Sequence, residues 1–170
     1  CLPTDRPDAV RGLCMIVWRI ATASPVYAAD DLSGEGARLT GGRWNSPSMA
    51  LLYTSSTIAL AVLETVVHLS SGGLPLNRYL IRIDIPDNLW ALRDESDQHS
   101  VPSGWDALPA GAASPGFGDA WLRSQRSVVL TVPSVIVPEE KNILINPTHP
   151  DARNITAQSL RRWTYDPRLF

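Results

Sequence analysis

The order of the predicted elements favours an α+β fold with a mostly antiparallel sheet. Short apolar runs typical of strands make up most of the pattern, helix-like segments are few, and the two kinds do not alternate as they would in a parallel βαβ sheet. The chain has 170 residues, of which 44% are hydrophobic and 19% charged. Such a chain is expected to form one globular domain with a sizeable core.

The first half of the chain predicts two strands separated by a long loop, followed by a helix. In the first strand, Trp18 and Ile20 lie on one face and Arg19 on the other. A long loop inside a compact domain is usually functional. The helix is largely apolar and is expected to end at Gly72–Gly73. The predicted elements are a strand over 16–20, a loop over 22–49, a strand over 50–53 and a helix from Ser55 or Ser56 to about residue 70.

The second half predicts more short strands, separated by turns and one short helix. Residues 77–85 alternate between apolar and polar side chains, and Pro86–Asn88 is a turn signal. Residues 94–115 are polar and irregular, and the tail from residue 155 is at best weakly amphipathic. Further strands are expected over 89–93, 128–132, 135–137 and 143–145, and a helix over 118–124.

Composition and the ends of the chain narrow the class of protein. Residues 1–14 are polar and turn-rich, so we treat them as an extension and expect a single domain over 15–170. The net charge of −2 lacks the basic excess of nucleic-acid-binding proteins. Cys1 and Cys14 are too few for a disulfide framework or a zinc site. No apolar run has membrane-spanning length, and a cytoplasmic protein is expected.

Glu64 is the most unusual candidate for chemistry. It lies in the apolar helix, flanked by Leu63, Val66 and Val67. Burying an unpaired carboxylate costs several kcal/mol, so a cationic or hydrogen-bonding partner is expected. The sequence offers Arg19, Arg43 and Tyr53 for this role. A purely structural Glu–Arg pair is the alternative interpretation.

Each of those three residues also has a functional and a structural interpretation. Arg43 follows two glycines, which allow close approach of a ligand, and its planar fork suits phosphate or carboxylate. It could equally belong to a tight turn anchored by Trp44. Tyr53 could stack on a flat heterocycle or pack in the core. Arg19 is either a second anion anchor that points inward or a residue on a solvated strand face.

Several common catalytic sites are excluded by their missing motifs. No Gly-x-Ser-x-Gly elbow is present, so Ser134 is not the nucleophile of an α/β-hydrolase. The three histidines are too scattered for a zinc motif. Neither a phosphate-binding P-loop nor a dinucleotide-binding glycine fingerprint occurs.

Taken together, the motifs resemble the RES-domain toxins, named after an arginine, a glutamate and a serine. The resemblance covers about residue 15 to the end, and the combination of motifs is more specific than any single one. The matching segments are Trp18–Ile20, Leu32–Arg38, Gly41–Asn45, Leu52–Ser55, Ala59–Glu64, Leu130–Pro138, Asn142–Pro147 and Tyr165–Phe170.

The resemblance implies an ADP-ribosyltransferase-like fold of the diphtheria-toxin type and a bacterial toxin that consumes NAD+. Family members pass ADP-ribose to water, phosphate or a protein. They are inhibited by a cognate Xre-like antitoxin, which covers or plugs the active site. Arg19, Arg43, Tyr53 and Glu64 occupy the family's functional positions. Ser134 fits the Val-Pro-Ser motif, while Ser114 and Ser127 compete for the role of the family's serine.

The residues fit this chemistry. Cleavage of the nicotinamide–ribose bond develops an oxocarbenium-like cation, which one carboxylate such as Glu64 can stabilise. The cationic nicotinamide leaves as a neutral molecule, so neither a general acid nor a metal is required. Arg19 and Arg43 would hold the pyrophosphate or ribose, and Tyr53 would stack on nicotinamide. A non-catalytic nucleotide-binding or interaction module is the alternative.

Overall fold

The computed structural model describes residues 14–69 and 76–169, and a seven-stranded sheet organises them. The strand order is β4-β5-β6-β2-β1-β3-β7, and every pairing is antiparallel except that of β4 with β5. The α+β class expected from the sequence is confirmed. The strands are β1 (Cys14–Thr22), β2 (Leu52–Ser55), β3 (Arg78–Pro86), β4 (Asp94–Glu95), β5 (Val129–Pro133), β6 (Lys141–Ile145) and β7 (Thr156–Arg162).

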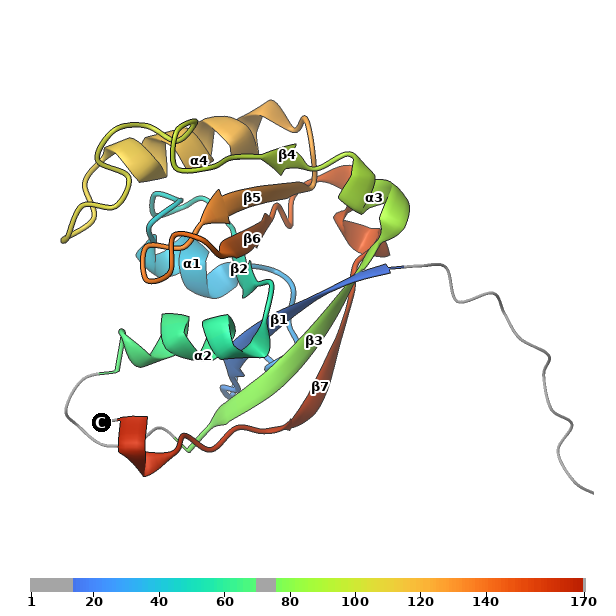
Figure 1. The fold of residues 1–170 in the computed structure, drawn as a ribbon. Helices are drawn as coiled ribbons and strands as arrows, with labels where there is room; N and C mark the ends of the chain where they lie inside the picture. Colours follow the sequence, from blue (N-terminus) through green and yellow to red (C-terminus); the bar gives the residue numbers. More distant parts are fainter. Residues whose placement is uncertain (1–13, 70–75, 170) are drawn as a thin grey trace, which may run out of the picture.

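The helices lie around the two halves of this sheet (Figure 1). Helix α4 runs along β4 and β5 at the top of the view. Helix α2 lies lower in the view, in front of β1. Within the described residues, no helix is both long enough and apolar enough to cross a membrane. The helices are α1 (Glu35–Thr40), α2 (Ile58–Val66), α3 (Asp87–Ala91) and α4 (Ala113–Ser124), with short 3-10 turns at Pro150–Asn154 and Pro167–Leu169.

The two halves of the sheet meet at a narrow joint. Strand β1 pairs with β3 along its whole length, but its register with β2 is the single pair Trp18 and Ser55. Strands β1, β3 and β7 therefore diverge from β2, β6 and β5, as Figure 1 shows. Adjacent strands that part in this way leave room for side chains from a covering helix to reach the joint.

The register also decides which side chains share a face. Trp18 is opposite Ser55, and Ser55 is opposite Asn142, so these three side chains lie on one face of the sheet. Helix α2 covers this face, since Ala61 and Val62 pack with Ile20 in one buried cluster. Side chains alternate along a strand, so Arg19 points to the other face.

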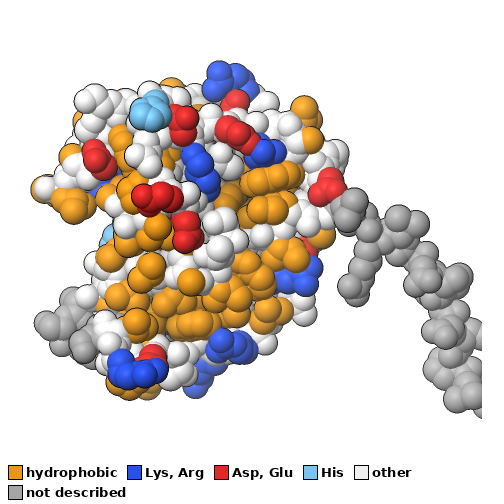
Figure 2. Space-filling view, viewed as in Figure 1, with side chains coloured by type: hydrophobic (Ala, Val, Ile, Leu, Met, Phe, Trp, Pro, Cys, Tyr) orange, Lys and Arg blue, Asp and Glu red, His pale blue; other side chains and the backbone are white. Residues whose placement is uncertain are grey.

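A hydrophobic surface accompanies α2. Leu63 on this helix and Val67 at its C-cap are 36% and 57% exposed. Figure 2 shows hydrophobic side chains gathered over the lower half of this view, where α2 lies, with acidic side chains above them.

Several predicted elements differ from the structure. Helix α1 lies inside the stretch expected to be a loop. In place of the turn expected over 86–88 and the strand expected over 89–93, α3 occupies Asp87–Ala91, with Pro86 as its extended N-cap. Residues 135–137 form no strand but a bend that follows Ser134. Strand β7 was not expected, because it is an edge strand whose mostly exposed side chains show no apolar alternation.

The ends of α2 also differ from the prediction. Thr57, rather than Ser55 or Ser56, is the N-cap, and its hydroxyl accepts a hydrogen bond from the N–H of Leu60. Ser55 still belongs to β2, where it faces Asn142. The helix ends at Val66, and the predicted stop at Gly72–Gly73 lies outside the described residues.

Candidate active site

Glu64 is held by neutral donors at the joint of the sheet. The hydroxyl of Ser134 donates to Glu64 Oε1 at 2.8 Å, and Asn142 Nδ2 donates to the same oxygen at 2.5 Å. Among the described residues, no ion pair includes this half-buried carboxylate. Its partners are therefore a hydroxyl and an amide. The prediction that Arg19, Arg43 or Tyr53 pairs with Glu64 is wrong.

Ser134 is fixed by its own backbone surroundings. It is fully buried immediately after β5, and its Oγ accepts hydrogen bonds from the N–H groups of Ile136 and Val137 at 3.1 and 3.2 Å. Its N–H donates to the carbonyl of Glu140 at 3.0 Å. Because two donors already point at Oγ, its single proton is directed to Glu64.

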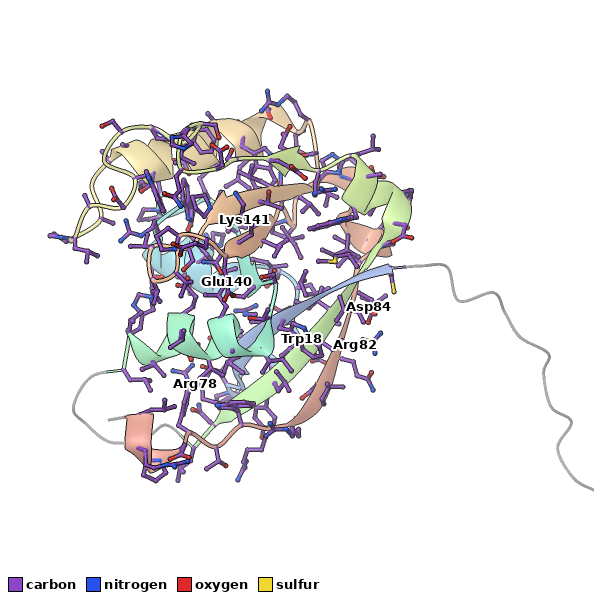
Figure 3. The ribbon with its side chains drawn as sticks, in the orientation of Figure 1. Trp18, Arg78, Arg82, Asp84, Glu140 and Lys141 are labelled. Atoms are coloured by element: carbon purple, nitrogen blue, oxygen red, sulfur yellow. The ribbon has the colours of Figure 1, made fainter. Side chains whose placement is uncertain are left out.

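The bend after Ser134 is fastened to the start of α2. Glu140 lies beside the first residue of β6 in Figure 3, between this strand and α2. The hydroxyl of Thr57, the N-cap of α2, donates to Glu140 Oε2 at 3.3 Å. The helix that carries Glu64 and the segment that carries Ser134 are thus joined at a second point.

The other two candidate serines have different surroundings. Ser127 accepts a hydrogen bond from Trp121 Nε1 at 3.0 Å and donates to Asp94 Oδ2 at 3.0 Å. It precedes β5, at the end of the strand opposite to Ser134. Ser114 is buried in α4. Of the three serines, only Ser134 contacts Glu64.

Arg43, on the loop that follows α1, lies close to Tyr53 on β2. The phenol of Tyr53 donates to Asn45 Oδ1 at 2.7 Å and accepts from the N–H of Trp44 at 2.9 Å. Burial raises the pKa of Tyr53, an effect that nearby Arg43 partly opposes. A side chain at Gly42 would collide with the phenol, because a Cβ atom there would lie 2.6 Å from its oxygen. The phenol therefore anchors this loop.

Arg43 is partly used to hold another loop. Its Nη1 donates to the carbonyl of Trp105 at 2.7 Å and to that of Ala107 at 3.2 Å. Within the described residues, its Nε and Nη2 make no hydrogen bond. The guanidinium thus keeps donors available while one nitrogen ties two loops together.

Arg19 faces a separate pocket of about 110 Å³ on the other side of β1. Arg78, at the start of β3 (Figure 3), lines the same pocket, together with Tyr27 and Asp31. Loss of solvent around Arg19 lowers its pKa, and the charge of Asp31 partly restores it. The guanidinium of Arg19 makes no hydrogen bond or ion pair with another residue of 14–69 or 76–169. The pocket is lined by two arginines and two carboxylates, Asp31 and Glu35, and the guanidinium of Arg19 keeps spare donors.

The structure thus brings the candidates into three groups rather than one. Glu64 contacts Ser134, Arg43 lies near Tyr53, and Arg19 lines a pocket to which Glu64 does not contribute. Asn142, a direct partner of Glu64, was missed. The available signal was an asparagine at the start of an apolar strand, where this residue type is depleted.

Comparison with known proteins identifies the family. The RES domain model matches residues 16–167. A Prs ADP-ribosylating toxin of Sphingobium sp. is 59% identical, over 90% of this chain and 95% of its own. A Toxin Res of Yersinia enterocolitica is 35% identical, over 91% of this chain and 99% of its own.

The fold comparison agrees with the sequence comparison. The toxin–antitoxin complex MbcT–MbcA of M. tuberculosis contains a chain that matches with a TM-score of 0.63 at 18% identity, covering 88% of this chain and 85% of that one. At this identity the likeness concerns the fold. With the family model and the relatives above, it follows that this chain belongs to the RES-domain family.

Proposed function

We propose that this protein is the toxin of a toxin–antitoxin pair and that it consumes NAD+ by cleaving the nicotinamide–ribose bond. Membership of the RES family and the ADP-ribosylating relative support the reaction class. The observation that carries the proposal is the carboxylate of Glu64, half-buried and held on one oxygen by two neutral donors. No cation in 14–69 or 76–169 pairs with it, so its full charge is available to a developing sugar cation.

The proposed step needs little from the protein besides this charge. The bond between ribose C1′ and the nicotinamide nitrogen breaks, and its electron pair leaves with nicotinamide and neutralises the pyridinium. The ribose becomes oxocarbenium-like and is stabilised by Glu64. A lone pair of the acceptor then forms the new bond to C1′, and the acceptor's proton passes to the carboxylate.

Arg19 and Arg43 are proposed to bind the anionic part of NAD+. Both keep guanidinium donors that no described residue uses, and guanidinium groups bind phosphate through paired N–H donors. Tyr53 contributes its ring face to nicotinamide, because its hydroxyl is already engaged by Trp44 and Asn45. Ser134 is proposed to orient Glu64 rather than to act as a nucleophile, because its proton and lone pairs are already engaged.

We propose a protein as the acceptor of ADP-ribose, with Prs as the first candidate. The supporting observation is the name of the Sphingobium relative, a Prs ADP-ribosylating toxin that is 59% identical. Water and inorganic phosphate are the competing acceptors, because all three would approach the same carbon. They differ in their products, and the products therefore separate them.

The experiment compares three reactions of the purified protein. In two of them it is incubated with NAD+, with and without phosphate, and the products are resolved by HPLC. In the third it is incubated with purified Prs and labelled NAD+, and the label on Prs is followed on a gel. The proposal predicts nicotinamide release and a labelled Prs band. Free ADP-ribose, or ADP-ribose 1-phosphate formed only with phosphate, would replace the protein acceptor by water or phosphate. Unchanged NAD+ in all three reactions would reject the enzyme and favour a non-catalytic binding module.

A cognate antitoxin is proposed to block this site. The fold is shared with a chain from a toxin–antitoxin complex, and Leu63 and Val67 expose apolar surface on the helix that carries Glu64. A partner that covered the carboxylate would also remove these two side chains from water. From the family resemblance we expect an Xre-like protein.

A further inference from the structure

We propose that Asn142, itself oriented by Ser55, is a positioning residue that holds the carboxylate of Glu64 so that Oε2 is the oxygen presented to the ribose. This inference deepens the proposed function and depends on it. Its basis is a chain of hydrogen bonds across two neighbouring strands and one helix, at the joint of the sheet.

The first link fixes the amide. Ser55 and Asn142 are directly opposite each other on β2 and β6, and Ser55 Oγ donates to Asn142 Oδ1 at 2.8 Å. Ser55 is only 3% exposed, so water does not compete freely for this hydroxyl. A rotated amide would bring Oδ1 against Glu64 Oε1, and two acceptors would then face each other. The carboxylate therefore selects the orientation in which Nδ2 points at Glu64, and Ser55 holds that orientation by donating to Oδ1.

The second link fixes the carboxylate. Asn142 Nδ2 donates to Glu64 Oε1 at 2.5 Å, and Ser134 donates to the same atom at 2.8 Å. Two donors that approach one oxygen from β6 and from the bend after β5 oppose rotation of the carboxylate. Within the described residues, Oε2 accepts no hydrogen bond.

The consequence is a division of labour between the two oxygens. Oε1 is committed to the protein, and Oε2 retains lone pairs for the ribose cation and for the acceptor's proton. Carboxylate charge helps the reaction only where it lies close to the atom that becomes positive. Loss of either donor would leave Glu64 charged but free to turn, and a displacement of about 1 Å can lower a rate about 100-fold.

The test compares four variants in the full chain. Asn142→Ala removes the donor, Ser55→Ala removes the group that orients it, and Ser55→Thr keeps a hydroxyl. Thr54→Val is the matched control. Thr54 is the neighbour of Ser55 on β2 and is also 3% exposed, but its hydroxyl donates to the carbonyl of Ile143 on the opposite face.

The expected result is a separation of kcat from KM. Asn142→Ala should lower kcat for NAD+ loss by about 100-fold with KM unchanged. Ser55→Ala should lower kcat less, because the amide can still reach the correct orientation part of the time, and Ser55→Thr should retain more activity than Ser55→Ala. Thr54→Val should lower Tm through loss of a buried hydrogen bond but leave kcat unchanged.

Two kinetic outcomes would overturn the inference. If Asn142→Ala lowers Tm to the same extent as Thr54→Val but keeps the kcat of the unmodified protein, Asn142 is structural. If it raises KM with kcat unchanged, Asn142 binds substrate instead of positioning Glu64.

A spectroscopic measurement keeps this inference separate from the proposed function. The side-chain amide resonances of Asn142 are followed by ¹H–¹⁵N NMR, and they should shift in Glu64→Gln and in Ser55→Ala but not in Thr54→Val. An unmodified protein that consumes no NAD+ rejects the proposed function and the catalytic part of this inference. Unshifted Asn142 resonances reject the positioning contact even if NAD+ is consumed.

Discussion

At the residue scale, the main physical feature is a carboxylate stabilised without a cation. Placing Glu64 beside an arginine would lower the cost of burial, but the arginine would also screen the negative charge. Ser134 and Asn142 hydrogen-bond to the carboxylate and leave its net charge intact. This arrangement suits a group that must stabilise a cation on its substrate.

Tyr53 gives the first residue-scale prediction. In Tyr53→Phe, the N–H of Trp44 and the Oδ1 of Asn45 both lose their partner. We expect unfolding free energy to fall by about 1–3 kcal/mol, the usual effect of leaving a buried polar group unsatisfied. Urea denaturation measures this change. Tyr79→Phe is the control, since no described residue hydrogen-bonds to its hydroxyl, and an equal loss in both variants would contradict the anchoring role.

The same phenol predicts a dependence of stability on alkaline pH. Burial raises the pKa of Tyr53, so the folded protein holds the phenolic proton more tightly than the unfolded chain does. Its contribution to stability is complete below the unfolded value of about 10 and declines as the pH rises above it. The difference in urea midpoint between the unmodified protein and Tyr53→Phe should shrink from about pH 9 to about pH 11. A constant difference over this range would be inconsistent with the shift.

How far the sequence predicts the site depends on the kind of contact. Glu64 stands out because a lone acid in an apolar helix is rare, and its need for a partner follows from desolvation. The identity of that partner does not follow, because Ser134 and Asn142 are 70 and 78 positions away along the chain. Only the pairing of β6 with β2 brings Asn142 to the helix.

At the element scale, local patterns predict strands that are buried on one face and fail where tertiary pairing decides. Strand β3 alternates and was predicted to within a residue at each end. Strand β7 pairs with β3 along an exposed edge, and its sequence carries no alternation. Helix α1 is short and has no buried residue, so its sequence shows no apolar stripe that would distinguish it from a loop.

The packing of α4 against the Arg43 loop gives an element-scale prediction. A Cβ atom at Gly118 would lie 1.8 Å from the carbonyl oxygen of Trp44, so Gly118→Ala must push the helix away from the loop. We expect a loss of about 3 kcal/mol or more in unfolding free energy.

Gly116, on the same helix, is the matched control. A Cβ atom there meets nothing within 4 Å, so Gly116→Ala should be neutral or stabilise the protein by up to about 1 kcal/mol. Thermal and urea unfolding of both variants measure the contrast. Equal stabilities would show that α4 does not pack closely on the loop.

At the scale of the whole molecule, a sheet with two diverging halves places the groups of the site on different elements. Helix α2 carries Glu64, β6 carries Asn142, and the loop after α1 carries Arg43. A partner that binds over α2 would therefore inhibit the enzyme by covering Glu64 alone, without contacting Arg43. We expect the purified cognate antitoxin to stop NAD+ loss at equimolar concentration, measured by titration. Full activity at saturating antitoxin would contradict this mode of inhibition.

The most direct test of the central claim is the rate of nicotinamide release, followed by ¹H NMR, for the unmodified protein and Glu64→Gln. The two proteins should have similar Tm, because glutamine keeps the shape of the side chain and can still accept from Ser134 and Asn142. The account predicts that Glu64→Gln releases nicotinamide at least about 100-fold more slowly, because the sugar cation loses its counter-charge. Release at an unchanged rate would contradict the assignment of Glu64 as the catalytic carboxylate.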